Sequence, residues 1–300
     1  MKFLNNKQLG AKRVIYMTIA TVYGVRIAGL ASATPQMRST VEDVAMEFGE
    51  EIAQKISETT GVQTRHIAGE TLCTSDLCVA AAEKLLDDLG WESDTISLLI
   101  FVSQTHDYIL PATAASVHGR LGLPKSCSAF DINLGCSGYV YGLWTISQLM
   151  GSGLFNRALL LVGDTSSHLV STKDRSAAPI FGDAGSATAL EKNHNAQPMY
   201  FDLGTDGTGT EHLIVPAGGC RIPHSNQTSE MIEDKNGNIR SDNNLYMNGT
   251  EIFTFTLREV PPMLRRVMDA TQWTFDEVDA FVFHQANLFI LNHLVKRMKR

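Results

Sequence analysis

One segment of the chain decides its fold, and it reads Ser128-Ala-Phe-Asp-Ile-Asn-Leu-Gly-Cys-Ser-Gly-Tyr-Val-Tyr-Gly-Leu143. A short apolar strand is predicted to run into a tight turn and then into a helix over Tyr139–Met150, which Gly151 and Gly153 end. This places Cys136 at a helix N-terminus, where unpaired N–H groups and the helix dipole favour a thiolate. Thiolate is the nucleophilic form of cysteine, so the segment indicates a side chain that can accept an acyl group. The alternative is a small buried residue, because free cysteine is common in protein cores.

A second segment, Asp279-Ala-Phe-Val-Phe-His-Gln-Ala-Asn287, reads as a buried strand that ends in polar side chains. His284 falls at the end of this predicted strand, and Gln285 and Asn287 follow it. A histidine in that place can present an Nε2–H donor to a thioester oxygen or to a developing enolate. The alternative for an isolated histidine is a hydrogen-bonded core residue. A Cys at a strand–helix turn with a His at a strand end is the pair that a single intracellular cysteine nucleophile needs.

The composition is that of a globular enzyme, with 300 residues of which 44% are hydrophobic and 19% charged. A chain of this length can bury a large core, either as one large domain or as two packed halves. The net charge of −7 argues against a general role with nucleic acids or anionic membranes. No apolar stretch has transmembrane length, so membrane insertion is not expected either.

The cysteine pattern and the N-terminus bear on the compartment. The five cysteines are scattered and lack the spacing of zinc ligands or of a disulfide framework: Cys73, Cys78, Cys127, Cys136 and Cys220. We therefore expect no metal and a reducing, cytoplasmic setting. Residues 1–16 are basic without a secretory apolar region, and we expect them to be an extension, disordered in one interpretation, that precedes a more strand-like sequence.

Two distant segments of the sequence align without a gap. Trp91-Glu-Ser-Asp-Thr-Ile-Ser-Leu-Leu-Ile-Phe101 matches Trp273-Thr-Phe-Asp-Glu-Val-Asp-Ala-Phe-Val-Phe283 at the Trp, the Asp, two branched positions and the Phe. An amphipathic helix is predicted before each segment, over roughly 75–89 and over roughly 251–271, the second interrupted by Pro261-Pro262. The match is short, but helix, turn, strand and polar loop in both places indicate two related α/β halves.

Further buried strands are expected over Ala158–Asp164 and within Ile180–Leu190, so strands and helices alternate as in layered α/β proteins. Gly182-Asp-Ala-Gly185 does not fit a phosphate-binding fingerprint and is interpreted as a turn packed against the site. The polar segment 216–244 is expected to be an irregular surface excursion, either a lid or a loop on a dimer side. We predict an N-terminal half over 17–195 and a C-terminal half over 196–300.

Collinear motifs cover nearly the whole chain from Val22 onward. Besides the Cys136 turn they are Thr60-Gly-Val-Gln-Thr-Arg-His-Ile67, Leu110-Pro-Ala-Thr-Ala114, Val162-Gly-Asp164, Asp174-Arg175, Phe181-Gly-Asp-Ala-Gly185, Met247-Asn-Gly249 and His284-Gln-Ala-Asn-Leu288. In these motifs the chain resembles the β-ketoacyl-acyl-carrier-protein synthase III family of thiolase-fold condensing enzymes. The resemblance implies a thiolase-like five-layer αβαβα fold built from two pseudo-repeated halves.

The same resemblance implies an acyltransferase that forms an acyl-Cys136 thioester and condenses it decarboxylatively with a malonyl thioester. His284 would assist decarboxylation and stabilise the enolate, with acyl-CoA and a malonyl carrier protein as substrates and no bound cofactor. Substrate-binding positions carried over are Arg175, Leu110, Phe181, Gly249 and Asn287. Arg175 would lie near the nucleotide of coenzyme A, with a surface ion pair as its alternative. Leu110 would shape the acyl pocket of a neighbouring subunit, with a core leucine as its alternative.

The sequence also departs from the family pattern. It stops at Arg300, before the family's Gly-Asn-Thr-Ser loop, so we expect the second half to be truncated at its C-terminus. Positions where the family has a Trp and two Arg residues for coenzyme A carry Lys55, Thr59 and Gln63. These departures suggest a specialised relative with a different acyl donor or acceptor.

A docking surface for an acyl carrier protein is expected along the start and the end of the helix that follows His284. The positions are Gln285, Phe289, Lys296 and Arg297. Phe289 stands where the family often has an arginine. A solvated helix terminus is the alternative for the basic pair.

Three functions follow from these patterns. The first is the decarboxylative condensing enzyme of fatty acid, specialised lipid or polyketide biosynthesis. The second keeps Cys136 but transfers the acyl group to an alcohol or amine without decarboxylation. The third is a non-catalytic partner subunit of a synthase, against which the presence of both Cys136 and His284 argues. The resemblance implies a homodimer in each case.

Overall fold

The computed structural model describes residues 19–298, and the predicted N-terminal extension lies outside them. A five-stranded sheet with strand order β2-β8-β7-β5-β6 forms the centre of the first half. Its strands are β2 (Val25–Ala33), β5 (Leu98–Val102), β6 (Ser128–Ile132), β7 (Arg157–Thr165) and β8 (Asp183–Lys192). Strands β5, β6 and β7 are parallel to one another, whereas β8 is antiparallel to both β7 and β2. The strands predicted in this half are therefore present, with β8 starting three residues later than the predicted region.

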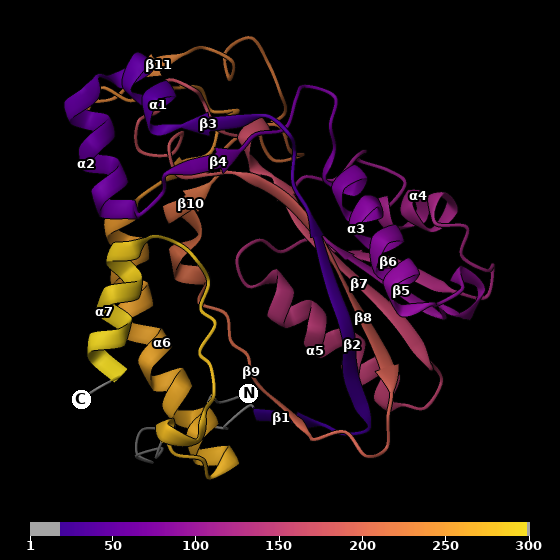
Figure 1. Cartoon of the computed structure of the whole chain (residues 1–300). Helices are drawn as coiled ribbons and strands as arrows, with labels where there is room; N and C mark the ends of the chain where they lie inside the picture. Colours follow the sequence, from indigo (N-terminus) through magenta and orange to yellow (C-terminus); the bar gives the residue numbers. More distant parts are fainter. Residues whose placement is uncertain (1–18, 299–300) are drawn as a thin grey trace, which may run out of the picture.

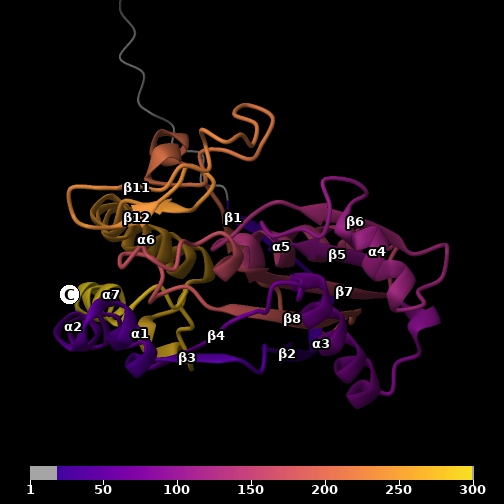
Figure 2. The same cartoon turned by 90° about the horizontal axis from the view of Figure 1, so that it is seen from above.

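Helices cover both faces of this sheet, as Figures 1 and 2 show. They are α3 (Thr74–Leu89) and α4 (Thr113–Arg120) on one face and α5 (Gly138–Gly151) on the other. Alternate residues of β5 supply the two apolar cores: Leu99 and Phe101 meet α3 and α4, while Leu98 and Ile100 meet α5. A strand that is buried on both faces needs a continuous apolar sequence, and Leu-Leu-Ile-Phe-Val provides it. The predicted helices in this half are confirmed, including Gly90 as the left-handed C-cap of α3.

A smaller helical hairpin stands at the far side of the molecule from α3 and α4. It consists of β3 (Arg38–Thr40), α1 (Val41–Phe48), α2 (Glu50–Thr60) and β4 (Thr64–His66), with β3 and β4 paired. The side chain of Thr40 caps α1. Helix α2 packs against α7 (Leu288–Met298) near the other end of the chain, as both views show. Segments far apart in sequence therefore meet on this side.

The second half is built differently from the first. Its strands are short: β10 (Leu213–Ile214) pairs with β13 (Tyr246–Met247), and β11 (Ile232–Glu233) with β12 (Ile239–Arg240). Strand β9 (Met199–Asp202) pairs with β1 (Ile19–Val22) of the first half. Long helix α6 (Gly249–Thr271) and α7 supply most of its regular structure. The segment 216–244 is the irregular excursion that its composition predicts, apart from the short β11–β12 hairpin.

Two predictions for the second half are wrong. Helix α6 continues through Pro261 and Pro262, although each proline removes a backbone donor, and its contacts with α7 and β9 hold both parts in one helix. The predicted buried strand over Asp279–His284 is absent: residues 278–287 have no regular secondary structure, and Val282 is 91% exposed. A strand needs a neighbour to satisfy its backbone groups, and no described strand pairs with this segment.

No helix within residues 19–298 is both long enough and apolar enough to cross a bilayer.

Candidate active site

The carboxyl ends of three parallel strands create the candidate site. Strands β5, β6 and β7 run in the same direction, so their C-terminal residues reach one edge of the sheet. The chain leaves β5 into the polar residues Ser103 and Gln104, leaves β6 into the turn with Cys136, and reaches Asp164 near the end of β7. Open α/β sheets bind ligands at this edge, because loops there bring side chains from several strands together.

The turn that holds Cys136 is the strand–helix turn that the sequence predicts. Strand β6 ends at Ile132, and α5 begins at Gly138 with Ser137 as its N-cap residue. Two glycines allow α5 to lie directly on the sheet. A Cβ on Gly138 would come within 2.7 Å of Val102 Cγ1, and one on Gly142 within 2.7 Å of Leu160 Cδ1. The close approach of α5 fixes the thiol at the sheet edge.

Cys136 is exposed, in contrast to the buried Cys78 and Cys127. Burial raises the pKa of Cys78 to about 12 and that of Cys127 to about 11, which leaves both unreactive. The predicted stabilisation of a Cys136 thiolate by the helix N-terminus is not the dominant effect. Desolvation by the surrounding protein raises the pKa of Cys136, and the nearby Asp164 carboxylate raises it further, while the backbone N–H of Cys136 lowers it. A nucleophile with a raised pKa needs a partner that removes its proton.

Asp164 organises the loop beside the nucleophile; the motif Val162-Gly-Asp164 contains it, but the sequence predicted no role for it. Its Oδ1 accepts hydrogen bonds from the Gln104 backbone N–H at 2.7 Å, from Ser103 Oγ at 3.0 Å, and from the N–H and Oγ1 of Thr105 at 3.2 and 3.1 Å. Burial raises the pKa of Asp164, and these donors lower it in part. A carboxylate at the end of a buried apolar strand is the sequence signal that could have identified it.

His284 lies in the irregular segment before α7, and its side chain is exposed. Desolvation lowers the pKa of His284 below its ordinary value of 6.5, so the imidazole is neutral at pH 7. Within residues 19–298 no hydrogen bond joins His284 to Cys136. Both side chains are exposed, and their pairing stays a prediction.

The two polar side chains that follow His284 in its motif, Gln285 and Asn287, form hydrogen bonds with backbone groups. Asn287 Oδ1 accepts a hydrogen bond from the Ile290 N–H at 2.8 Å and so caps the first turn of α7. Gln285 Nε2 donates to the Phe283 carbonyl at 3.0 Å. That Asn287 binds substrate stays a prediction, since capping already explains this side chain.

The start of α7 is held by a motif from the first half. Gly61 ends α2 in the left-handed conformation with φ 75° and contacts Leu288, whose Cβ would lie 3.1 Å from a Cβ at Gly61. A larger residue would be strained there by both the backbone conformation and the contact. The Thr60-Gly61 turn therefore supports the chain immediately after the His284 motif.

Among the other predicted substrate residues, Arg175 and Gly249 lie in one region, and Phe181 and Leu110 lie elsewhere. Arg175 donates through Nη2 to the Asn236 carbonyl in the β11–β12 turn, and Gly249 starts α6 in a groove that this turn borders. Phe181 lines a separate, largely apolar cavity of about 340 Å³, and its carbonyl accepts from Arg65 Nη1 at 2.7 Å. Leu110 is 79% exposed, so it is not the core leucine of the alternative interpretation.

The predicted carrier-docking residues spread over α7 and the residues before it. The Phe289 ring packs 5.0 Å from that of Phe253 and 4.3 Å from His293, and it remains half exposed. Lys296 and Arg297 are exposed in the last turn of α7, where cations also interact favourably with the helix dipole. Ring packing explains the position of Phe289 and the helix dipole that of the two cations, and carrier docking stays a prediction.

In the part of the chain that the structure describes, no group of three or more histidine, cysteine, aspartate or glutamate side chains is arranged to hold a metal ion.

Comparisons with known proteins place these features in a family. A family model described as 3-oxoacyl-[acyl-carrier-protein (ACP)] synthase III matches residues 130–207, which include the Cys136 turn. A putative 3-oxoacyl-[acyl-carrier-protein] synthase 3 of Campylobacter jejuni is 32% identical over 277 residues, which are 91% of this chain and 78% of the relative. A β-ketoacyl-[acyl-carrier-protein] synthase III of Caldanaerobacter subterraneus is 32% identical over 245 residues, or 81% of this chain and 71% of that one.

Solved structures give the same result for the fold. A 3-oxoacyl-(acyl-carrier protein) synthase from Burkholderia xenovorans superimposes with a TM-score of 0.88 at 42% identity, covering 94% of this chain and 79% of that one. A 3-oxoacyl-(acyl carrier protein) synthase III from Pseudomonas aeruginosa does so with a TM-score of 0.77 at 30% identity, covering 92% and 80%. This likeness confirms the predicted thiolase-like α/β fold.

Proposed function

The chain belongs to the 3-oxoacyl-[acyl-carrier-protein] synthase III family, and from this premise we propose that Cys136 carries the acyl group and that His284 assists the condensation. The protein is a condensing acyltransferase, as its family membership shows. Its substrates are an acyl-CoA and a malonyl-acyl-carrier protein, and the family's reaction uses no cofactor. What remains to be assigned is the role of each side chain.

The proposed reaction has two steps. In the first, the Cys136 sulfur attacks the donor thioester carbonyl, the thiol of the donor leaves with the proton, and an acyl-Cys136 thioester remains. In the second, the malonyl thioester loses carbon dioxide, and its C2 attacks the acyl carbonyl while the Cys136 sulfur leaves. Negative charge develops on the malonyl thioester oxygen, so neutral donors already aimed at that oxygen lower the barrier.

One observation carries the proposal: Cys136 is an exposed thiol on the strand–helix turn at the carboxyl edge of the parallel strands. The state of His284 supports its part. An imidazole whose pKa is lowered by desolvation can donate a hydrogen bond to an enolate in its neutral form. The same neutral ring can accept the proton of the Cys136 thiol, whose pKa is raised.

The remaining roles are proposals that rest on the family and on position. Gly249 lines the groove beside the β11–β12 turn, and Arg175 donates to the Asn236 carbonyl of that turn, so both are assigned to the nucleotide-bearing part of the thioester donor. Phe181 and Asn287 would contact the acyl-pantetheine chain. Gln285, Phe289, Lys296 and Arg297 would meet the carrier protein, with the two cations facing its acidic surface.

We also propose that the protein works as a homodimer in the cytoplasm. Tyr108, Ile109 and Leu110 form an exposed apolar loop, with Ile109 94% exposed. In the family arrangement this loop enters the acyl pocket of a second copy. An Ile109→Glu variant would then be monomeric in sedimentation velocity if the wild type is dimeric, and an unchanged dimer would exclude this loop from the interface.

Intact-protein mass spectrometry with a panel of acyl-CoA donors tests the nucleophile. We expect the wild type and Cys220→Ala to gain one acyl mass and Cys136→Ala to gain none, since Cys136 and Cys220 are both exposed and differ in their place in the fold. Undiminished labelling of Cys136→Ala would refute the assignment.

The second step is tested by adding a malonyl carrier protein to the acylated enzyme. We expect His284→Ala to be acylated as the wild type is, but to release less carbon dioxide by a factor of about 10² or more. Acyl transfer to an alcohol or amine without release of carbon dioxide by the wild type would favour the non-decarboxylating reaction instead.

A further inference from the structure

Residues 103–105, which directly follow β5, are fixed at the edge of the sheet beside the turn of the nucleophile. Asp164 Oδ1 accepts hydrogen bonds from Ser103 Oγ at 3.0 Å and from the Gln104 backbone N–H at 2.7 Å. The N–H and Oγ1 of Thr105 donate to the same oxygen at 3.2 and 3.1 Å. The backbone of Gln104 is therefore held in place from both sides by one carboxylate at the end of β7.

The side chain of Gln104 extends from this fixed backbone to the turn between β6 and α5. It lies against Gly135, because a Cβ on that glycine would meet Gln104 Oε1 and come within 3.1 Å of Gln104 Cδ. Gly135 directly precedes Cys136, and consecutive Cα atoms are about 3.8 Å apart. The Gln104 amide is therefore close enough to meet the first few carbons of an acyl chain on the Cys136 sulfur.

The polar atoms of the Gln104 side chain are free, unlike those of its two neighbours. Ser103 Oγ and Thr105 Oγ1 both donate to Asp164. In the part of the chain that the structure describes, no hydrogen bond joins the Gln104 amide to another protein group. This exposed amide offers one carbonyl acceptor and two N–H donors.

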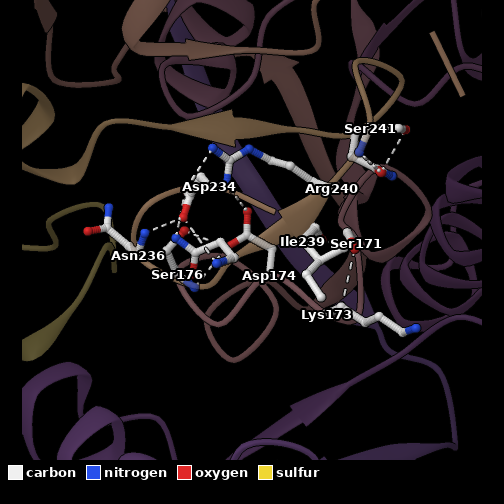
Figure 3. Close-up of polar contacts among 11 residues, drawn as sticks. Ser171, Lys173, Asp174, Ser176, Asp234, Asn236, Ile239, Arg240 and Ser241 are labelled. Atoms are coloured by element: carbon white, nitrogen blue, oxygen red, sulfur yellow. Dashed lines mark hydrogen bonds and ion pairs between the residues drawn. The ribbon is translucent and has the colours of Figure 1, made fainter. Parts of the chain in front are cut away.

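A larger polar cluster elsewhere in the molecule shows the opposite arrangement (Figure 3). Arg240 donates to Asp174 Oδ2 at 3.1 Å and to Asp234 Oδ2 at 3.0 Å, so these three charges are paired with one another. That cluster holds the β11–β12 hairpin in place. The Gln104 amide, by contrast, lies beside the nucleophile and keeps its hydrogen-bonding capacity for a substrate.

We propose that Gln104 is a specificity-determining residue, whose side-chain amide binds a hydroxyl group on C2 or C3 of the acyl chain that Cys136 accepts. This inference rests on the proposed function, in which Cys136 carries the acyl group. A hydroxyl both donates and accepts hydrogen bonds, and a carboxamide matches both roles, which neither a carboxylate nor an ammonium group does. The fixed backbone lowers the entropy lost on binding, because only the side-chain torsions of Gln104 remain to be ordered.

The test compares acyl-CoA donors that differ only by a hydroxyl in place of a methyl group. 3-Hydroxybutanoyl-CoA is paired with 3-methylbutanoyl-CoA, and 2-hydroxybutanoyl-CoA with 2-methylbutanoyl-CoA. Intact-protein mass spectrometry gives the initial rate of Cys136 acylation at a low concentration of each donor. We expect the wild type to favour the hydroxylated donor of one pair by about tenfold, the effect of one net hydrogen bond. The pair that shows this preference identifies the carbon that bears the hydroxyl.

Gln104→Met separates hydrogen bonding from packing. Methionine is also long and unbranched but lacks a strong donor or acceptor, so it can keep the contact with Gly135. We expect the ratio of the two rates to fall to within about twofold in Gln104→Met and in Gln104→Ala.

Gln148→Met is the matched control, because it makes the same substitution at an exposed glutamine of the helix that follows the nucleophile. Gln148 lies about 15 Å along α5 from the first residue of that helix, Gly138. We expect this variant to keep the wild-type ratio in both pairs of donors.

Two results would overturn the inference. One is a wild type that favours the hydroxylated donor in neither pair. The other is a Gln104→Met variant that keeps the wild-type ratio; if it were slowed equally with all four donors, the side chain would only support the turn of Cys136. Failure of the proposed function is distinct from both, since it would appear as a wild type that no donor acylates at Cys136.

Discussion

The two segments that share a sequence pattern differ in structure. Each forms a short 3₁₀ turn after its tryptophan, at Ser93–Thr95 and at Phe275–Glu277. After that turn the first segment becomes β5, in which Ile100 is fully buried, whereas the second remains irregular, and its equivalent residue Val282 is 91% exposed. The same local pattern therefore gives a 3₁₀ turn in both segments but a β-strand only in the first.

The turn depends on local hydrogen bonds, whereas the strand depends on neighbouring strands. The turn is local, and in the second segment Thr274 and Glu277 close it with two hydrogen bonds of 2.8 Å. Strand β5 depends on β6 and β7 on either side of it, which satisfy its backbone groups. In the second segment the side chains alternate as in an extended chain: the rings of Phe281 and Phe283 stack with their centroids 6.3 Å apart, and Val282 between them is exposed. No described strand flanks this segment.

This contrast separates the two proposed catalytic residues. Cys136 stands on a turn between a buried strand and a helix that lies directly on the sheet. His284 lies within the irregular segment, which is held at its C-terminal end by the cap of α7 and by the Gly61 contact. We expect the nucleophile to be fixed by the first half alone and the position of His284 to depend on what packs against its segment.

Hydrogen exchange should show the largest difference between the two segments. Amides of Leu99–Val102 open only with the whole sheet, whereas those of residues 279–283 lack ladder bonds, so we expect them to exchange on the order of 10³-fold faster. Exchange at single-residue resolution by mass spectrometry or NMR measures this. Equal protection of both segments would mean that residues 279–283 have a strand partner in solution.

Alanine substitution at the two equivalent positions, Ile100 and Val282, should lower the free energy of unfolding by amounts that differ by about 2–5 kcal/mol. Ile100→Ala removes a fully buried side chain between β5 and α5, and we expect it to lower the free energy of unfolding by about 2–5 kcal/mol. The equivalent Val282→Ala removes an exposed side chain and should change it by less than about 0.5 kcal/mol. Urea unfolding gives both values, and a cost above about 1 kcal/mol at Val282 would contradict the exposed position.

The sequence predicted most of the first half because its signals there are complete. Leu98–Val102 and Arg157–Thr165 are long apolar runs, and Gly90 and Gly151 end helices as expected. The strand at Asp279–His284 was wrong because an apolar run shows the capacity to be buried and does not show what will cover it. The prolines in α6 were over-interpreted, because tertiary contacts outweighed the local propensity there.

For the candidate site, the sequence predicted the turn of Cys136 and its place at a helix N-terminus. It did not predict the raised pKa, because desolvation depends on the packing of α5 against Val102 and Leu160, which lie far apart in the sequence. The part that Asp164 plays was missed for a related reason. It comes from contacts with residues about 60 positions away, which no local pattern records.

The smallest expected effect is that of the Asp164 carboxylate on the pKa of Cys136, both of which lie in the first half. Asp164 is the last of the causes that raise the pKa of Cys136, after desolvation. Asp164→Asn removes the negative charge but keeps the Oδ1 acceptor for Ser103, Gln104 and Thr105. The thiolate is then less disfavoured, so the pKa of Cys136 should fall and the midpoint of its alkylation by iodoacetamide should move to lower pH.

Asp107→Asn provides the control for this shift. Asp107 is also partly buried, and its charge raises the pKa of Cys73 and Cys78 without being among the causes that act on Cys136. Alkylation measured peptide by peptide should therefore show a lower midpoint at Cys136 in Asp164→Asn and an unchanged one in Asp107→Asn. An unchanged midpoint at Cys136 in both variants would mean that desolvation alone sets its reactivity, and an upward shift in Asp164→Asn would mean that the loop of Gln104 moves and buries the thiol more deeply.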